Sequence, residues 1–248
     1  MDLKEKWIQE SKKGMEGWDF SYLDGRMEEE PLPWDYETII RTHLKSDHEL
    51  LDMGTGGGEF LLKLGHPYEK TSVTEGYRPN FKLCVEKLAP LGIKVKFVTE
   101  DDRLTFADAS FDIVLNRHES FDPKEVYRVL KPGGIFITQQ VGGADNREMA
   151  EFLIDNVPES PYKSHTLENN IGLIESAGLE ILDSDEYLSE VKFYDVGALV
   201  YFASIIDWEF PGFSVEKSFE RLMELEKIVK EQGFITSKQH RFIIVARK

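Results

Sequence analysis

A cluster of glycines follows a short apolar segment and constrains the fold of this chain more than any other feature. Residues 50–53 are LLDM, residues 54–58 are GTGGG, and residues 60–64 continue with apolar side chains at helical spacing. Glycine reaches positive φ easily and lets a ligand approach the backbone closely. The pattern therefore predicts a strand, a tight turn that is a candidate ligand site, and a helix. For the loop taken alone, a plain tight connection remains an equal alternative.

Short apolar segments alternate with helical segments along the middle of the chain. The segments that we expect to be strands are residues 49–53, 71–74, 95–98, 111–115 and 135–138. Pro79 and Pro123 suit the first turns of two of the helices between them. This alternation predicts an α/β fold whose sheet is parallel and covered by helices on both faces. Such a sheet binds ligands at the carboxyl ends of its strands.

The C-terminal part is less regular, and its apolar spacing indicates further helices before a last buried strand. The expected helices are residues 166–177, 195–206 and 214–232, and the expected strands are 179–182 and 242–246. The N-terminal part is rich in aromatic side chains. The expected organisation is an N-terminal helical and aromatic cap segment (1–45), a ligand-binding core (46–187), a helical insertion that forms a wall of the substrate site (188–234) and a final core strand (235–248).

Charge and cysteine content limit the classes of partner. The chain has 248 residues, with 46 acidic and 30 basic side chains and a formal net charge of −16. This charge argues against non-specific binding to nucleic acid, because contacts to phosphates need Lys and Arg. Cys84 is the single cysteine, which excludes an intramolecular disulfide and a cysteine-based zinc site. No run of about 18 apolar residues suggests a membrane span. We expect a cytoplasmic protein that holds no metal.

Acidic residues near the glycine loop favour a ligand that carries positive charge. A dinucleotide fingerprint would have glycine where Glu59 stands, and the Lys-Ser/Thr pair of a P-loop is absent. A cationic sulfonium with an amino-acid group fits this setting better than a pyrophosphate. Glu75, 21 residues after Gly54, can accept hydrogen bonds from both hydroxyls of a ribose. A carboxylate of the run 100–102 can accept one from an adenine amino group.

Five segments become specific when they are taken together in their order and spacing. They are LLDMGTGGGEFL (50–61), VTEGY (73–77), the acidic run (100–102), LTFADASFDIVL (104–115) and VLKPGGIFI (129–137). In these segments the chain resembles the class I S-adenosylmethionine (SAM)-dependent methyltransferases. The resemblance implies a Rossmann-like, doubly wound sheet of seven strands with an antiparallel last strand. It also implies SAM as the cofactor and S-adenosylhomocysteine (SAH) as the product.

The resemblance also implies a set of cofactor-binding residues. Asp52 would brace the glycine loop, Glu75 would bind the ribose, and Asn116 would lie beside the methionine part of SAM. Which acid of the run 100–102 meets the adenine stays open. The whole expected set is Asp52, Gly54, Thr55, Gly56, Glu75, Gly76, Tyr77, Glu100, Asp101 and Asn116.

Candidates for the methyl-acceptor side follow the fourth and fifth expected strands. His118 and Glu119 are the candidate catalytic pair, with His118 as a base or an orienting group. The alternative is that both only form hydrogen bonds within the neighbouring loop. The expected substrate-binding residues are Trp34, Tyr36, Gln139 and Trp208. The alternative for the two N-terminal aromatic residues is packing on the sheet, and for Gln139 it is hydrogen bonding at the exposed strand end. For Trp208 the alternative is a place in the core or in an oligomer contact.

The segments RHES, TQQVGG and DVGALVYF extend the resemblance to a bacterial subgroup that is loosely similar to ubiquinone- and menaquinone-biosynthesis methyltransferases. The function that we expect is methyl transfer from SAM to a small molecule by a monomer or homodimer. An RNA methyltransferase and a non-catalytic SAM-binding module are the alternatives. The first predicts a basic face, of which the sequence gives no sign, and nothing in the sequence rejects the second.

Overall fold

The computed structural model describes residues 2–15, 20–99 and 103–248, and the chain divides into two compact units. Unit 1 consists of Met1–Leu32, Gly142–Ser164 and Tyr187–Arg241, and unit 2 consists of Pro33–Val141, His165–Glu186 and Phe242–Lys248. These units group residues by compactness alone. The functional segments expected from the sequence, with their limits at residues 45, 187 and 234, therefore remain predictions.

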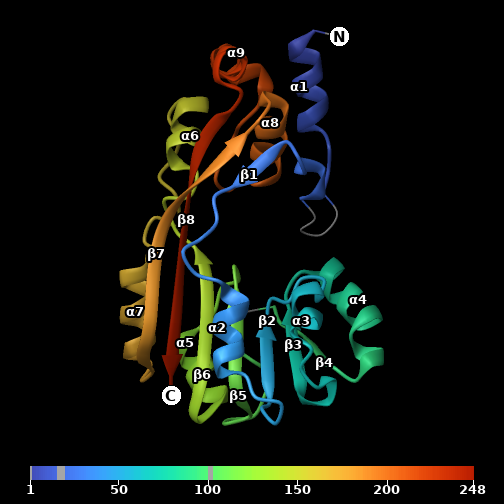
Figure 1. Cartoon of the computed structure of the whole chain (residues 1–248), viewed down its shortest axis with the longest axis vertical. Helices are drawn as coiled ribbons and strands as arrows, with labels where there is room; N and C mark the ends of the chain where they lie inside the picture. The colour runs from blue at the N-terminus through green and yellow to red at the C-terminus, as the bar shows by residue number, and fades with distance from the viewer. Residues whose placement is uncertain (1, 16–19, 100–102) are drawn as a thin grey trace. The chain divides into compact units, whose positions relative to one another are not determined.

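Unit 2 is built on parallel strands joined by helices. Its elements are α2 (Tyr36–His43), β2 (Leu50–Met53), α3 (Glu59–Leu64), η2 (Tyr68–Lys70), β3 (Thr71–Glu75), α4 (Arg78–Lys87), η3 (Ala89–Leu91), β4 (Lys94–Phe97), β5 (Phe111–Arg117), α5 (Pro123–Val129), β6 (Leu130–Val141) and α7 (Leu167–Ser176). The strands β4, β3, β2, β5 and β6 are neighbours in that order, and each adjacent pair is parallel (Figure 1). Their carboxyl ends therefore lie along one edge of the sheet.

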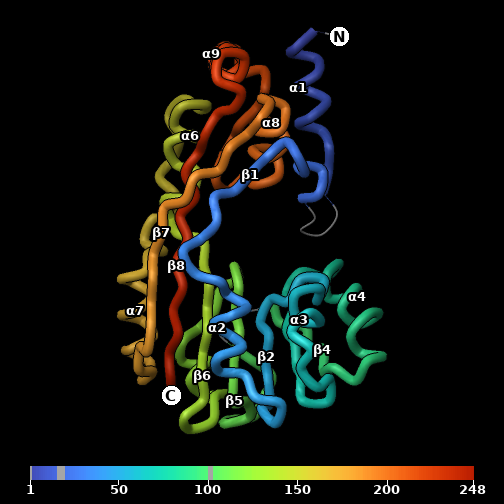
Figure 2. The backbone as a smooth tube through the Cα atoms, in the orientation of Figure 1, coloured from blue at the N-terminus to red at the C-terminus, as the bar shows by residue number. Residues whose placement is uncertain are grey.

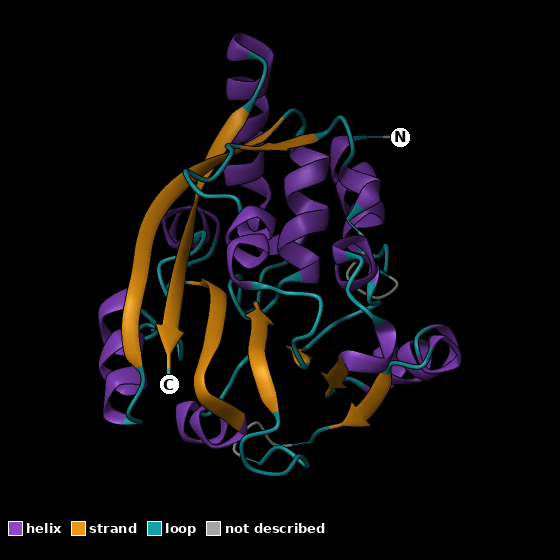
Figure 3. Ribbon diagram, turned by 60° about the horizontal axis from the view of Figure 1, so that its bottom comes forward, coloured by secondary structure: helices purple, strands orange, loops and turns teal. Residues whose placement is uncertain are grey.

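Successive side chains along these strands belong to two different apolar clusters, because side chains alternate between the faces of a sheet. Helices lie on both sides of the strands (Figure 3). Leu50 and Ile113 belong to an apolar cluster with residues of α2, α3 and α4. Their neighbours Leu51 and Val114 belong to a second cluster, with residues of α5 and α7. Strands that are buried on both faces have continuous apolar sequences, as β2 and β5 do. The expected α/β class is confirmed.

The last strand, β8 (Ile235–Arg247), lies beside β6 and runs antiparallel to it. The N–H of Gly133 donates to the carbonyl of Lys248, and the N–H of Gly142 donates to the carbonyl of His240. As the residue number rises along β6, its partner's number therefore falls along β8. This direction confirms the expected antiparallel last strand.

The sheet has one strand more than the family resemblance implies. Among the described residues the strand order is β1-β7-β8-β6-β5-β2-β3-β4. The additional strand is β1 (Met27–Glu29), which pairs antiparallel with the end of β7 (Glu180–Phe193). The described residues therefore form eight strands rather than seven, because an N-terminal segment adds to the edge of the sheet. Figure 2 traces β1 and β7 as backbone tubes.

Unit 1 has an apolar core formed by helices and by the parts of β7 and β8 that belong to it. Its helices are α1 (Leu3–Ser11), η1 (Ser21–Leu23), α6 (Arg147–Leu153), α8 (Val196–Ile205) and α9 (Val215–Gln232). α8 is buried from Val196 to Ala203, which explains why it is apolar all round. Trp7 of α1 is fully buried and packs against Phe219 of α9.

β7, β8 and α6 differ from the elements expected from the apolar runs in the sequence. β7 continues to Phe193 instead of ending near 182, and most of its side chains are exposed or half-buried, so no apolar run marks its length. β8 begins at Ile235, before the apolar run 242–246 within the expected final core strand 235–248, because polar residues alternate through its first half. The short helix α6 was not expected at all.

Candidate functional site

The glycine loop between β2 and α3 has a backbone conformation that favours glycine. Gly54 and Gly56 have φ of +67° and +61°. The N–H groups of Gly54 and Thr55 both donate to the carbonyl of Thr74, which ties the loop to β3. A Cβ built on Gly54 would lie 2.6 Å from side-chain carbons of Glu119. The loop and the end of β5 therefore meet closely at this glycine.

Glu75, the last residue of β3, turns its buried carboxylate toward the loop. Its Oε2 accepts from the N–H of Gly56 at 2.9 Å, and its Oε1 accepts from the N–H of Tyr77 at 2.8 Å. These two backbone donors stabilise the charge of the buried carboxylate. Each oxygen keeps a further lone pair for a ligand hydroxyl. Between Glu75 and Tyr77, Gly76 lies so close to the Val98 carbonyl that a Cβ would come within 3.0 Å of it.

Asp52, in β2, is buried beside the same loop. Burial is the largest influence and raises the pKa of Asp52 to about 6, and the Glu75 carboxylate adds to the rise. The Thr55 hydroxyl and the Arg117 guanidinium oppose it. Although the Thr55 hydroxyl is close enough to act on Asp52, its buried Oγ1 has no hydrogen-bond partner of normal geometry in the described part of the chain.

Asn116, near the end of β5, is held by a buried polar network. Its Oδ1 accepts from the Thr138 hydroxyl at 2.9 Å and from Gln140 Nε2 at 2.5 Å. Gln140 Nε2 also donates to the backbone carbonyl of Glu119, which can only accept, so the orientation of the Gln140 amide is fixed. The Asn116 oxygen therefore faces Gln140. Asn116 Nδ2 is left buried and without a hydrogen-bond partner among the described residues.

His118, Gln139 and Trp34 form a second connected group at the same edge. The backbone N–H of His118 donates to the Gln139 carbonyl at 2.9 Å, and His118 has a φ of +58°. Trp34 Nε1 donates to Gln139 Oε1 at 2.9 Å. Gln139 Nε2 lies 3.2 Å from His118 Nε2. These contacts hold the imidazole between the ends of β5 and β6.

The remaining predicted site residues differ in exposure. Tyr36 is buried, and its hydroxyl donates to the Asn116 carbonyl at 3.1 Å, while burial raises the pKa of Tyr36. Tyr77 is 59% exposed at the end of β3, as a residue that stacks on a ligand needs to be. Trp208, in unit 1, is 42% exposed. Glu100 and Asp101 lie outside the described residues. The substrate-binding roles stay predictions.

Thr138, Gln140 and Arg117 also support the site, through contacts that the sequence did not predict. The parallel register pairs Asn116 with Thr138 across β5 and β6. Aligning the two expected strands 111–115 and 135–138 by their apolar residues would have placed Asn116 beside Thr138. The Arg117 guanidinium lies 4.6 Å from the centre of the Phe60 ring, in α3. No sequence pattern pointed to that contact.

Cys84 of α4 lies against the inner side of the glycine loop. Its thiol donates to the Gly56 carbonyl at 2.9 Å and is buried. Burial raises the pKa of Cys84 to about 12, with smaller contributions from Glu75 and Glu59. The thiol is therefore neutral at physiological pH and supports the loop through a hydrogen bond.

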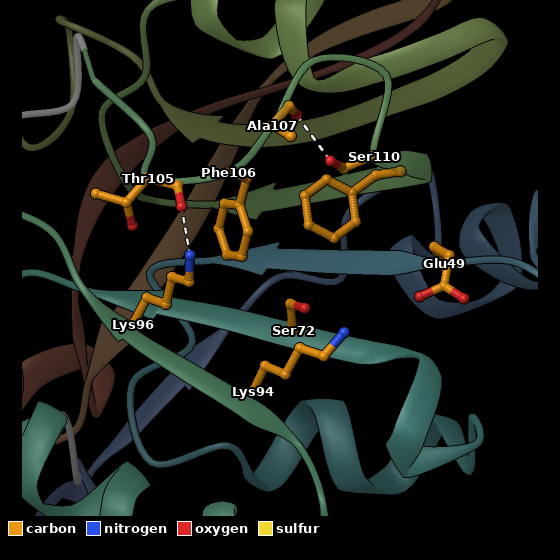
Figure 4. Close-up of a pocket in the computed structure, with 9 residues that line it drawn as sticks. Glu49, Ser72, Lys94, Lys96, Thr105, Phe106, Ala107 and Ser110 are labelled. Carbon is orange, nitrogen blue, oxygen red and sulfur yellow. Dashed lines mark hydrogen bonds between the residues drawn. The ribbon is translucent and has the colours of Figure 1, made fainter.

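A separate pocket of about 340 Å³ lies in unit 2 (Figure 4). Its lining residues are Glu49, Ser72, Lys94, Lys96, Thr105, Phe106, Ala107, Ser110 and Phe111. Glu49 precedes β2 and Lys94 begins β4, so this pocket lies at the amino ends of the strands. The Lys96 amino group donates to the Thr105 carbonyl and lies over the Phe106 ring. The glycine loop is at the opposite ends of the strands, and the pocket is not part of that site.

Neither a metal-binding cluster nor a membrane-spanning helix is found in residues 2–15, 20–99 and 103–248. Within these ranges, no group of three or more His, Cys, Asp or Glu side chains is arranged to bind a metal ion. No helix in the same ranges combines the length and apolar character needed to cross a membrane.

Comparison with known proteins identifies related sequences. Residues 51–138 match the family described as Methyltransferase domain. The chain is 21% identical over 175 residues to carboxy-S-adenosyl-L-methionine synthase of Nautilia profundicola. This match covers 58% of this chain and 75% of that protein. The chain is also 29% identical over 104 residues to 2-methyl-6-phytyl-1,4-hydroquinone methyltransferase of Synechocystis. This second match covers 39% of this chain and 32% of that protein. The second match thus spans about a third of that relative.

The fold is shared with solved structures. The YcgJ protein of Bacillus subtilis superposes with a TM-score of 0.59 at 17% identity, covering 86% of this chain and 97% of that one. The family match begins in β2, includes the glycine loop, Glu75 and Asn116, and ends at Thr138. The matched segment thus contains the glycine loop, Glu75 and Asn116, whereas Trp34, Gln139 and Gln140 of the candidate site lie outside it. Residues 51–138 of this chain are thus similar to methyltransferase domains, and its fold is that of the solved structures it matches.

Proposed function

We propose that the chain transfers a methyl group from SAM to a small-molecule acceptor, with SAM held at the carboxyl ends of β2, β3 and β5. The observation that carries this assignment is a pair of buried polar atoms without partners among the described residues, Thr55 Oγ1 and Asn116 Nδ2. Each buried atom left unsatisfied costs about 1–3 kcal/mol. The carboxylate of SAM can accept from both atoms, and its ammonium can donate to the hydroxyl.

The charges around the loop also suit SAM. Asp52 and Glu75 are buried carboxylates beside the loop, and SAM brings a cationic sulfonium and an ammonium. Glu75 presents its free lone pairs to the ribose hydroxyls, and the exposed ring of Tyr77 covers the adenine. Glu100 and Asp101 remain the proposed adenine acceptors. Gly54, Gly56 and Gly76 let the cofactor approach the backbone closely.

The chemistry that SAM supplies when bound is an activated methyl group open to in-line displacement. The protein therefore has to align an acceptor and exclude water. His118 and Glu119 follow Asn116 at the end of β5, and Gln139 lies beside them on β6. We assign the acceptor side to this group, with Trp34 next to it. An acceptor role for Trp208 stays a prediction.

A small molecule is the favoured acceptor class. The net charge of −16 works against binding RNA phosphates. One curated relative is, by its name, a methyltransferase that acts on a substituted hydroquinone, which supports a small organic acceptor. The acceptor itself, the cytoplasmic location and the monomeric or homodimeric state remain expectations.

The test of this function is transfer of labelled methyl groups into fractionated bacterial extract. The purified protein is incubated with methyl-tritiated SAM and either the low-molecular-mass fraction or total RNA. Label in small molecules, together with SAH formation, is the expected result. Label in RNA would replace the proposal with RNA methylation. SAM binding without any transfer would leave a non-catalytic SAM-binding module.

Gly54→Ala should abolish SAM binding, and Gly65→Ala is its matched control. Both glycines have nearly the same φ, +67° and +68°, so both variants carry a similar backbone strain of about 1–2 kcal/mol. Only the Cβ at position 54 collides with Glu119, whereas nothing lies within 4 Å of a Cβ at position 65. Calorimetric titration with SAM measures the difference. Equal affinities in the two variants would contradict the placement of SAM at this loop.

Glu75→Gln should weaken SAM binding about 10- to 100-fold, the value of a hydrogen bond to a charged acceptor. The amide also points an NH2 group at one of the two backbone donors of Gly56 and Tyr77. Glu86→Gln, in the exposed part of α4, is the control with the same change of charge. Titration with SAM and with SAH measures both variants. A wild-type dissociation constant for Glu75→Gln would reject the ribose assignment.

Asp52→Asn should change how stability depends on pH. In the folded chain the pKa of Asp52 is raised to about 6, while the unfolded chain has the ordinary value near 4. The folded state therefore binds this proton more tightly, and ionisation of Asp52 destabilises the fold as pH rises from about 4 to 6. The unfolding free energy of the wild type should fall relative to Asp52→Asn by on the order of 2–3 kcal/mol across that window. Urea unfolding at several pH values measures this difference, and a constant difference would refute the assignment.

A further inference from the structure

The three side chains Trp34, Gln139 and His118 form a chain of hydrogen bonds in which every role is fixed by chemistry. An indole nitrogen can only donate, so the Gln139 atom that faces Trp34 Nε1 at 2.9 Å is the amide oxygen. The other end of that amide is an NH2 group, which can only donate. It lies 3.2 Å from His118 Nε2. His118 Nε2 therefore accepts a hydrogen bond from this NH2 group, so this nitrogen carries no proton.

We propose that Trp34 and Gln139 are positioning residues that hold His118 as the neutral tautomer with its proton on Nδ1. The inference rests on the proposed function for its role in methyl transfer, but the tautomer itself follows from the contacts alone. The backbone supports the arrangement, because the His118 N–H donates to the Gln139 carbonyl and so fixes the two residues side by side. The unusual φ of +58° at His118 is part of the same local structure.

This tautomer changes the role expected for His118. Its Nε2 lone pair is occupied by the Gln139 amide, so taking a proton there would break that bond and set two N–H donors against each other. His118 is therefore a hydrogen-bond donor through Nδ1 rather than a general base through Nε2. Such a donor can form a hydrogen bond to an oxygen or nitrogen lone pair of the methyl-acceptor molecule. The site then suits an acceptor whose nucleophilic atom is reactive without losing a proton to His118.

The first test is the nitrogen NMR spectrum of histidine in the folded wild-type protein, without SAM. Two-bond correlations between ring protons and nitrogens distinguish a protonated nitrogen from one that carries a lone pair. The chain has six histidines, and the His118 signals are those that disappear in His118→Asn. At pH 8 we expect a protonated Nδ1 and an unprotonated Nε2. A proton on Nε2 would overturn the proposal.

Two variants test the origin of the tautomer. Gln139→Glu replaces the donor by a carboxylate that only accepts, so the proton should move to Nε2. Trp34→Phe removes the indole donor, frees the amide to turn over, and should give a mixture of tautomers. Gln232→Glu, on the exposed part of α9, is the control for the Gln-to-Glu change and should leave the His118 signals in place. Unchanged His118 signals in Gln139→Glu would show that Gln139 does not set the tautomer and would refute the proposal. If a variant does not fold, the spectrum of the wild-type protein still decides which nitrogen carries the proton.

The link to methyl transfer has a separate readout. Once the extract assay supplies an acceptor, Gln139→Glu should lower turnover about 100-fold, the usual effect of losing one aligned donor at a reacting group. Its dissociation constant for SAM should stay within about twofold of the wild-type value, because none of the residues assigned to SAM changes. Equal turnover with a shifted tautomer would separate His118 from the reaction. Failure of SAM to bind the wild type would refute the proposed function and leave the tautomer result intact.

Discussion

The parallel register of β2, β5 and β6 is the constraint on which the site depends. It sets Met53 beside Asn116 and Asn116 beside Thr138, so that polar residues placed far apart in the sequence meet at one edge. Parallel strands need long connections, and the helices in those connections cover both faces. The buried polar network at the strand ends therefore depends on the alignment of the apolar strands below it.

Negative charge is concentrated where this alignment exposes the loop. Asp52 and Glu75 are both buried there, and burial of an uncompensated carboxylate is costly. Glu75 is stabilised by two backbone donors, whereas burial dominates at Asp52 and raises its pKa. The two carboxylates thus differ in the way the protein tolerates them. A cationic ligand bound beside the loop would stabilise the ionised form of both carboxylates.

The sequence predicted the parts of the fold whose signals are local. Glycines after an apolar strand, prolines in first helical turns and continuous apolar strands each act within a few residues, so the β2 loop, Glu75 and the parallel α/β character of the core could be inferred. The contacts that orient the site are not local. Gln140 meets Asn116 only through the β5–β6 register, and the Trp34–Gln139 bond joins residues 105 positions apart. The length of β7 was also hidden, since its exposed side chains remove the apolar signal.

Cys84 adds a consequence for experiments on this protein. Its thiol is buried against the Gly56 carbonyl, and its raised pKa keeps it in the unreactive protonated form. A thiol reagent can reach it only when the glycine loop separates from α4. Because the chain has a single cysteine, the rate at which a thiol reagent labels it measures how often the loop opens. A ligand that holds the loop closed would lower the rate of Cys84 labelling, even when no methyl group is transferred.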